Sequence, residues 1–386
     1  MKKLNILFKY PANSCTFLFI FLIVSFFVKN SFSCYFYEKI FNFTFFKISN
    51  NYFCFSFDTS KLINELFMTL FFFSVGLELK YYFKYKLYNS KFAAFIPIFS
   101  GVGGMLFPTI IYYLFTIKYP NLMKGISIPI TTDITFVSGI TKSLSNIYSE
   151  NIRNLLLSIS VFDDLVAMFF ILIFYNKNNL FGYFILINSI FILVFMRLLK
   201  IKKKIYYLFF GIFFWILVLL NNFHTNFVGF ILGCIFPGNK KYTYELNKSL
   251  QRINSYFILP IFAFFNGGIN FSKLVFKNLC INLFFGIYFG LLVGKPIGIT
   301  IFYIIYKKIF FFFNSKEKII IDYNFIEIFL ISILCGIGFT MSIFMSNLSF
   351  LNNENLLLTS KLGILLSSFT SIFLGIFFPY FFLKNK

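Results

Sequence analysis

Charged side chains are scarce in this sequence of 386 residues. Asp, Glu, Lys and Arg make up 12% of it, hydrophobic residues make up 59%, and the mean hydropathy is +0.82. A soluble globular domain is about one quarter charged, so this composition excludes a cytosolic enzyme. The net charge of +22 does not indicate a nucleic-acid-binding protein either, because its basic residues would need a folded aqueous surface that the sequence does not provide.

Several residue types are nearly absent. The chain has one Trp, one His and three Arg, against 67 Phe and 24 Tyr. This bias, together with the excess of Lys, Asn and Ile, is typical of an AT-rich genome, so charge alone does not identify a partner. The six Cys lack the spacing of metal ligands, although Cys34 and Cys54, in one predicted external loop, could form a disulfide.

Long apolar runs dominate what is present, and twelve of them approach the length of about 17 to 25 residues that spans a bilayer. They cover residues 12–28, 63–79, 92–117, 122–141, 155–175, 180–199, 205–220, 223–236, 253–269, 279–306, 325–350 and 356–383. Backbone groups find no water in the bilayer core, so the runs must be helices. The sequence therefore predicts an all-α integral membrane protein with about twelve transmembrane helices in a single transmembrane domain, residues 1–386. We expect the first run to be a retained helix rather than a signal peptide.

The distribution of basic residues predicts the orientation. If the N-terminus is cytoplasmic, the short cytoplasmic segments contain 24 Lys and Arg and the opposite segments contain 9. Basic residues are enriched on the cytoplasmic side of membrane proteins, so both termini should face the cytoplasm. The two remaining lysines, Lys295 and Lys361, fall inside predicted spans.

Four charged residues lie near the middle of predicted spans: Asp133, Asp163, Asp164 and Lys295. A charge at the centre of a spanning helix costs about 2.5 to 3.5 kcal/mol and usually marks an ion pathway. Asp163 and Asp164 are adjacent, about 100° apart around a helix axis, so the two carboxylates cannot both ionise freely. Their protons belong to the pair rather than to either residue.

Carboxylate oxygens suit a small alkali cation, and a proton would stabilise the same groups in competition with it. Competition at one site is the minimal requirement of an exchanger. The alternative is that Asp163 and Asp164 form buried ion pairs with Lys295 that only hold helices together. Three intramembrane carboxylates against one lysine leave an excess of negative charge, which favours the ion site.

Two predicted spans are interrupted near the middle. Pro129 with Thr131 and Thr132 interrupts the fourth, and Gly336 with Gly338 interrupts the eleventh. Paired interruptions in corresponding halves indicate the binding site of an inverted-repeat transporter. We therefore predict unwound backbone at these positions, two crossed discontinuous helices, and inverted repeats at about 92–175 and 279–383.

Half-helices that face each other in a crossing need charges that balance their dipoles. Asp133 is placed to neutralise the N-terminal ends, and Lys295 is placed to neutralise the C-terminal ends. Gly336 and Gly338 taken alone could equally serve close helix packing.

Seven motifs in order over nearly the whole chain resemble the NhaA family of bacterial Na⁺/H⁺ antiporters. They are Val-Gly-Leu-Glu-Leu-Lys (75–80), Thr-Thr-Asp-Ile (131–134), Asp-Asp-Leu (163–165), Phe-Ala-Phe-Phe-Asn-Gly-Gly (262–268), Gly-Lys-Pro-Ile-Gly (294–298), Leu-Cys-Gly-Ile-Gly-Phe-Thr-Met-Ser-Ile-Phe (334–344) and Lys-Leu-Gly-Ile-Leu (361–365). The resemblance implies a twelve-helix inner-membrane protein in which Asp163 and Asp164 bind Na⁺ and protons. It also implies that Lys295 pairs with Asp163 when no Na⁺ is bound.

The resemblance implies roles for two further residues, and the sequence departs from the family pattern in one region. Glu78 matches a position near the cytoplasmic funnel, although it could equally be an ordinary solvated helix end. His224 matches a position linked to the pH response, although a lone interfacial His is more often just solvated. Tyr81-Tyr82, Asn247, Lys248 and Gln251 stand where the family has titratable residues of its cytoplasmic pH-sensing region. The departure leaves the transport site intact and puts steep pH control in doubt.

We therefore predict an electrogenic antiporter that exports Na⁺ or Li⁺, imports protons, and regulates internal pH and sodium. Its partners would be these ions and the lipid bilayer, with no nucleic acid and no cofactor, and it could form a homodimer. Three alternatives are a passive cation channel, a symporter of the related bile-acid carrier fold, and an inactive protein degraded by drift. The retained central charges argue against the last.

Overall fold

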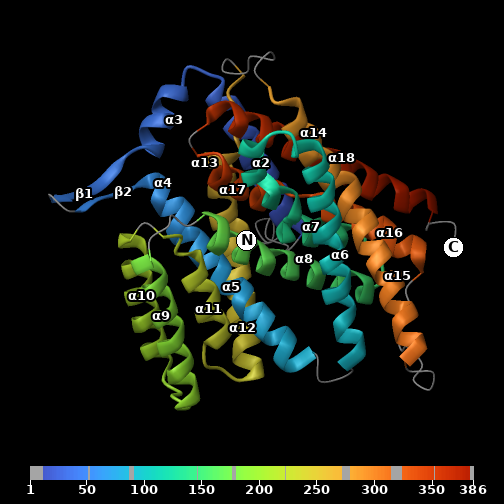
Figure 1. Cartoon of the computed structure of the whole chain (residues 1–386), viewed down its shortest axis with the longest axis horizontal. Helices are drawn as coiled ribbons and strands as arrows, with labels where there is room; N and C mark the ends of the chain where they lie inside the picture. Colours follow the sequence, from blue (N-terminus) through green and yellow to red (C-terminus); the bar gives the residue numbers. More distant parts are fainter. Residues whose placement is uncertain are drawn as a thin grey trace, which may run out of the picture. The chain divides into compact units, whose positions relative to one another are not determined.

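The chain is described by a computed structural model over residues 12–50, 53–86, 91–145, 147–175, 180–221, 223–271, 279–313, 324–351 and 353–382. It is mostly helical (Figure 1). The α-helices are α2 (Ala12–Lys29), α3 (Cys34–Phe41), α4 (Thr59–Lys61), α5 (Met68–Tyr81), α6 (Lys91–Thr116), α7 (Ile134–Ser143), α8 (Glu150–Phe170), α9 (Leu180–Leu198), α10 (Lys204–Leu220), α11 (Asn226–Ile235), α12 (Lys240–Ile253), α13 (Leu259–Gly267), α14 (Ile281–Phe289), α15 (Lys295–Phe313), α16 (Phe325–Ile333), α17 (Phe339–Ser349) and α18 (Glu354–Phe382).

Short segments of tighter or wider helix extend or join these helices. Pro120–Ile130 and Leu334–Gly336 are 3₁₀ helices, and Leu62–Phe67, Tyr82–Lys86, Ile171–Tyr175, Asn254–Ile258 and Gly290–Gly294 are π-helical. The last of these directly precedes α15, so Lys295 begins a helix immediately after a wide turn. Such π-helical turns are frequent at functional sites.

Each predicted apolar run coincides with a helix or with a pair of consecutive helices. Within the described ranges, four helices are long and apolar enough to cross a bilayer, and this number becomes six if each of two bent pairs is one span. The four are Thr59–Lys84, Phe95–Thr116, Ile281–Ile309 and Glu354–Phe382. The helical character of the fold is confirmed, and the count of twelve spans stays a prediction.

The all-α prediction is wrong between the first two runs. The antiparallel strands β1 (Thr44–Asn50) and β2 (Phe53–Asp58) form a two-stranded sheet there, with Phe46 opposite Phe57. Aromatic and β-branched residues favour strands, but these segments are far shorter than a membrane span, so a search for long apolar runs passes over them. The Cys54 side chain, one half of the possible disulfide with Cys34, lies outside the described part of the chain.

The chain forms two compact units. Unit 1 contains Met1–Ile20, Ser90–Ala167 and Ile269–Lys386, and unit 2 contains Phe21–Asn89 and Met168–Gly268. Asp133, Asp163, Asp164 and Lys295 all belong to unit 1, as do both predicted interruptions. The proposed inverted repeats also fall almost entirely within unit 1, and their symmetry relation stays a prediction.

Small residues allow close helix packing in both units. In unit 1 a Cβ added to Gly294 would lie 2.8 Å from the Pro108 Cα of α6, so the π-helical segment just before Lys295 packs almost backbone to backbone against α6. In unit 2 a Cβ on Gly233 of α11 would lie 3.0 Å from the Gly76 Cα of α5. Small interfacial residues of this kind are typical of helices that associate in a membrane.

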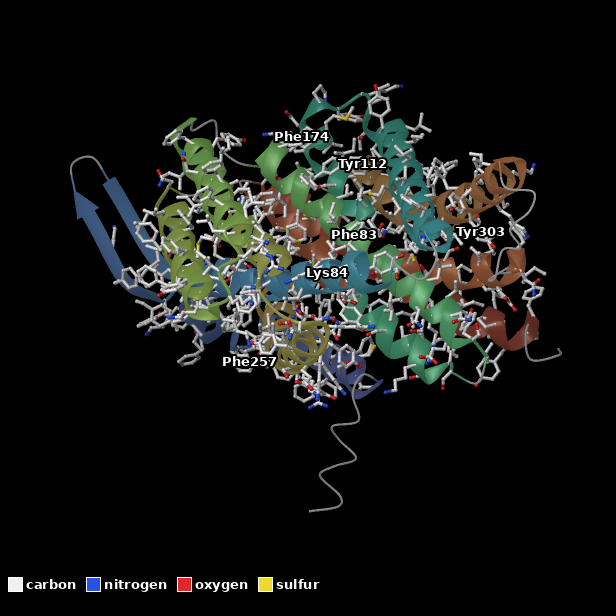
Figure 2. All side chains as sticks on the ribbon, turned by 90° about the horizontal axis from the view of Figure 1, so that it is seen from below. Phe83, Lys84, Tyr112, Phe174, Phe257 and Tyr303 are labelled. Carbon is white, nitrogen blue, oxygen red and sulfur yellow. The ribbon has the colours of Figure 1, made fainter. Side chains whose placement is uncertain are left out.

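Large apolar side chains also point outward from the helices. Phe174 is 62% exposed and Phe257 is 53% exposed, and both rings lie at the surface of unit 2 (Figure 2). Outward-facing aromatic residues in long apolar helices are suited to contact with lipid chains.

Candidate functional site

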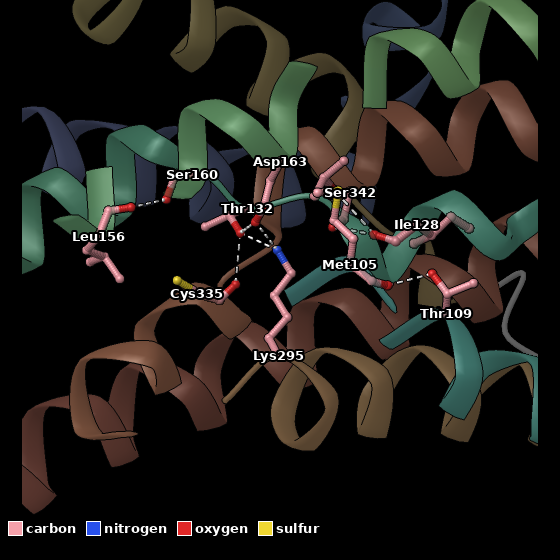
Figure 3. A network of polar contacts seen from close by, with 11 residues as sticks. Met105, Thr109, Ile128, Thr132, Leu156, Ser160, Asp163, Lys295, Cys335 and Ser342 are labelled. Carbon is pink, nitrogen blue, oxygen red and sulfur yellow. Dashed lines mark hydrogen bonds and ion pairs between the residues drawn. The ribbon is translucent and has the colours of Figure 1, made fainter. Parts of the chain in front are cut away.

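Three side chains from different elements of unit 1 meet in one polar network. Lys295 Nζ lies 2.7 Å from Asp163 Oδ2 and also donates a hydrogen bond to Thr132 Oγ1. Thr132 Oγ1 lies 2.7 Å from the same Asp163 oxygen. Figure 3 shows Asp163 on α8, Lys295 on α15 and Thr132 in the break before α7. The predicted contact between Asp163 and Lys295 is therefore present in the structure.

The network is enclosed by apolar helices. Asp163, Asp164, Thr132 and Lys295 all have no exposed surface. Within the described residues, Asp163 Oδ1 accepts no hydrogen bond. A buried ion pair is costly to form unless further hydrogen bonds stabilise it, and an unused buried carboxylate oxygen is a ready ligand for a cation.

The Thr132 hydroxyl connects the ion pair to the second broken helix. Its oxygen lies 2.7 Å from Asp163 Oδ2 and 3.2 Å from the backbone carbonyl oxygen of Cys335. The hydroxyl has a single proton, so it donates to one of these acceptors at a time while it accepts from Lys295. A shift of Asp163 or of the Cys335 carbonyl can therefore alter the hydrogen bond that Thr132 makes to the other acceptor.

Asp133 caps two helix N-termini at once. Its Oδ1 accepts hydrogen bonds from the amides of Thr135 and Phe136, at 3.0 and 3.2 Å, at the start of α7. Its Oδ2 accepts from the Thr340 amide at 3.1 Å, and from the Thr340 hydroxyl, at the start of α17. A carboxylate there satisfies amides that lack helical partners and opposes the positive ends of both dipoles. These contacts match the predicted charge balance at the N-terminal ends.

Both predicted interruptions are real breaks in helical structure. The helix before Asp133 ends at Ile130, and residues 131–133 are not helical. The segments Phe325–Gly336 and Phe339–Ser349 meet at an angle of 48°. The Asp133 amide donates to the Ile337 carbonyl at 2.8 Å, which joins the two breaks directly.

Hydroxyl groups join the two breaks a second time. Thr131 Oγ1 lies 2.8 Å from Ser342 Oγ, which in turn donates to the Ile128 carbonyl at 3.0 Å. Gly336 ends the 3₁₀ helix Leu334–Gly336 and Gly338 is the N-cap residue of α17, so the backbone is non-helical at residues 337–338 rather than at Gly336; both glycines are buried. Lys295 contacts Asp163 and Thr132, and its role toward helix C-termini stays a prediction.

Glu78 and His224 lie in unit 2, each with polar partners from that unit. Glu78 Oε2 accepts a hydrogen bond from Gln251 Nε2 at 3.0 Å. His224 Nδ1 lies 3.0 Å from Glu65 Oε1, and the amide and hydroxyl of Thr225 each donate to Glu65 Oε2 at 2.9 Å. Both residues thus occupy polar clusters of their own.

Sequence reasoning missed some of these participants. Glu65 lies at the start of the second apolar run, so a charge at this position does not stand out as one near the middle of a span. Thr340 and the Cys335 carbonyl gave no separate signal, because an ordinary hydroxyl and a backbone oxygen acquire a role only through the tertiary contact.

The chain is similar to known proteins over most of its length. A family model described as Na⁺/H⁺ antiporter 1 matches residues 6–378. The chain is 38% identical, over 98% of its length and 96% of the relative, to a protein named Na⁺/H⁺ antiporter NhaA from Wigglesworthia glossinidia brevipalpis. Proteins of the same name from Pectobacterium atrosepticum and Haemophilus ducreyi are 33% and 32% identical, each over 81% of this chain and 80% of the relative.

Proposed function

The chain belongs to the NhaA family of Na⁺/H⁺ antiporters, and from this premise we propose that it exports Na⁺ or Li⁺ from a bacterial cell in exchange for imported protons. The exchange takes place across the inner membrane, with both termini in the cytoplasm. It serves to regulate internal pH and sodium.

The buried pair of Asp163 and Lys295 beside the equally buried Asp164 is the observation that carries this proposal. In the Na⁺-free state Lys295 neutralises Asp163. An incoming Na⁺ takes over that neutralisation and uses the carboxylate oxygens of Asp163 and Asp164 as hard ligands. A proton stabilises the same carboxylates, so the two cations exclude each other and the site is occupied by one or the other.

Electrogenic exchange requires that one Na⁺ displaces more than one proton. The two carboxylates and the Lys295 ammonium together can hold and release enough protons for this, because the local charge balance changes when Na⁺ binds. Net positive charge then enters the cell in each cycle, and the membrane potential helps to expel Na⁺.

Alternating access in this proposal depends on the two broken helices. Asp133 holds the N-termini of α7 and α17 together through four hydrogen bonds, and Lys295 opposes the C-terminal ends. Unwound backbone at the site can change its hydrogen bonds with little rearrangement of the surrounding helices. The site is thereby opened to one side of the membrane at a time.

Everted membrane vesicles provide the test. After acidification of the vesicle interior, added Na⁺ or Li⁺ should release the trapped protons and restore the fluorescence of an acidity-sensitive dye. An imposed membrane potential should change the initial rate if the exchange is electrogenic. A passive channel would instead let Na⁺ equilibrate without accumulating against its gradient, and that result would refute the proposal.

A further inference from the structure

Helix α18 contacts the break between α16 and α17 through one hydroxyl group. Ser368 is fully buried, and its oxygen accepts hydrogen bonds from the amides of Gly338 at 3.2 Å and Phe339 at 3.3 Å. The same hydroxyl donates its proton to the Ile364 carbonyl, one turn earlier in α18, at 2.7 Å. Its donor and its acceptor functions are therefore both used.

These contacts complete the capping of α17. The first amides of a helix have no partner within the helix, and Gly338, at the N-cap position, has no side chain to supply one. Asp133 accepts from the third of these amides, that of Thr340. Ser368 accepts from the two amides before it, those of Gly338 and Phe339. The N-terminus of α17 is therefore capped by a neutral hydroxyl group and by a carboxylate.

The backbone at this point is in an unusual conformation. Phe339 has a φ of +22°, which is uncommon for a bulky residue and persists only where the surroundings enforce it. Its ring stacks on Phe136, with centroids 4.4 Å apart, and meets the edge of Phe369 at 5.7 Å. Ser368 and Phe369 are neighbours, so one segment of α18 holds both the backbone and the side chain of Phe339.

The same break supplies contacts to the ion-binding network. The Cys335 carbonyl faces the Thr132 hydroxyl, which lies next to Asp163, and the Ile337 carbonyl accepts from the Asp133 amide. A shift of Gly338 and Phe339 would move these carbonyls, because Ile337 directly precedes Gly338 in the chain and Cys335 lies three residues before it.

We propose that Ser368 is a positioning residue for ion exchange, whose hydroxyl fixes the Gly338–Phe339 backbone so that the break presents Thr340 to Asp133 and the Cys335 carbonyl to Thr132. The proposal rests on the antiport function proposed above. It places one determinant of cation affinity in α18, which contributes no charged residue to the site.

Ser367 offers a matched control. It is also fully buried on α18, and its hydroxyl donates to the same Ile364 carbonyl, at 2.9 Å. The difference is that Ser368 accepts from the α17 amides. Replacing either serine by alanine removes a hydrogen bond to the Ile364 carbonyl. Only S368A also removes the contact to the α17 amides, so the comparison isolates the effect of that contact.

The experiment measures the half-saturating Na⁺ concentration, the maximal rate and the thermal unfolding midpoint in the natural chain, S367A, S368A, S368C and S368T. Loss of a helix cap typically changes an equilibrium by roughly fivefold, so S368A should raise half-saturating Na⁺ by about that factor. S368C keeps the packing but offers a weak acceptor, so it should show a similar rise, whereas S368T keeps the hydroxyl and should stay near the natural value.

The outcomes separate the two proposals. If the natural chain shows no Na⁺-driven proton release, the antiport function itself is refuted. If it exchanges ions and S368A matches S367A in Na⁺ affinity, the positioning role is refuted. A lower unfolding midpoint in S368A and S368C with unchanged Na⁺ affinity would also overturn it, since the hydroxyl would then serve stability alone.

Discussion

Each unit contains an acidic side chain that contacts a basic one, and the two contacts differ in how deeply they are buried. In unit 1 the Asp163–Lys295 pair has no exposed side-chain surface. In unit 2 the side chains of His224 and Glu65 are 18% and 14% exposed. The buried pair stands beside another buried carboxylate, Asp164, whereas Glu65 receives two hydrogen bonds from Thr225. We propose that the first arrangement holds a transported cation, whereas the carboxylate in the second is satisfied by neighbouring residues.

The largest effect should come from removing the charge of the buried carboxylates. D163N or D164N should abolish Na⁺-driven proton release while the protein still inserts, because an amide keeps the shape and cannot titrate. Vesicles with matched amounts of each variant would test this. Exchange at the natural rate in either variant would show that the ion site lies elsewhere.

Removing the lysine should have the next largest effect. K295A leaves Asp163 buried without its partner, which typically costs roughly 3 to 5 kcal/mol, so both the unfolding midpoint in detergent and the transport rate should fall. K295R keeps a positive charge and should retain much of each. Equal losses in K295A and K295R would indicate that the ammonium group has a specific chemical part, such as carrying a transported proton.

The partly exposed pair should respond much less. H224Q removes a contact of a kind that contributes about 0 to 1 kcal/mol to the free energy of unfolding. The amide and hydroxyl of Thr225 would still bind Glu65. We expect a small change in the unfolding midpoint and exchange close to the natural rate at one fixed pH. A loss of exchange as large as that in D163N would contradict the expected difference between the partly exposed pair and the buried pair.

The sequence predicted the charged parts of the site better than its neutral parts. Asp163 and Lys295 are far apart in the chain, yet each was identified alone, because a charge in a membrane span needs an explanation. The interruptions at Thr131–Thr132 and at Gly336 and Gly338 were recognised from Pro, Thr and Gly in apolar runs. Ser368 could not be recognised, since buried serines that bond only their own helix look the same in sequence.

The fold, too, was predictable from the sequence only in part. Long apolar runs located the helices, because bilayer thickness sets their length. The hairpin of β1 and β2 was missed, since its two short strands carry no comparable length signal. The break angle of 48° between the segments of the eleventh run also depends on contacts from α7 and α18, which no local pattern encodes.

The region around Glu78 bears on pH control. Glu78 accepts a hydrogen bond from Gln251, and an amide does not titrate, so this contact lacks the paired titration that could switch a gate steeply. Acidification should then act mainly through protons that compete with Na⁺ at Asp163 and Asp164. His224 is the single histidine of the sequence, which makes H224Q the necessary control.

The dependence of transport on Na⁺ concentration, measured at several pH values in the natural chain and in H224Q, tests the central claim of competition most directly. If protons and Na⁺ compete for the site, half-saturating Na⁺ rises gradually as the pH falls, while the maximal rate at saturating Na⁺ changes little in both proteins. Half-saturating Na⁺ that stays constant, with a maximal rate that collapses over about one pH unit in both, would contradict it and indicate a dedicated gate elsewhere.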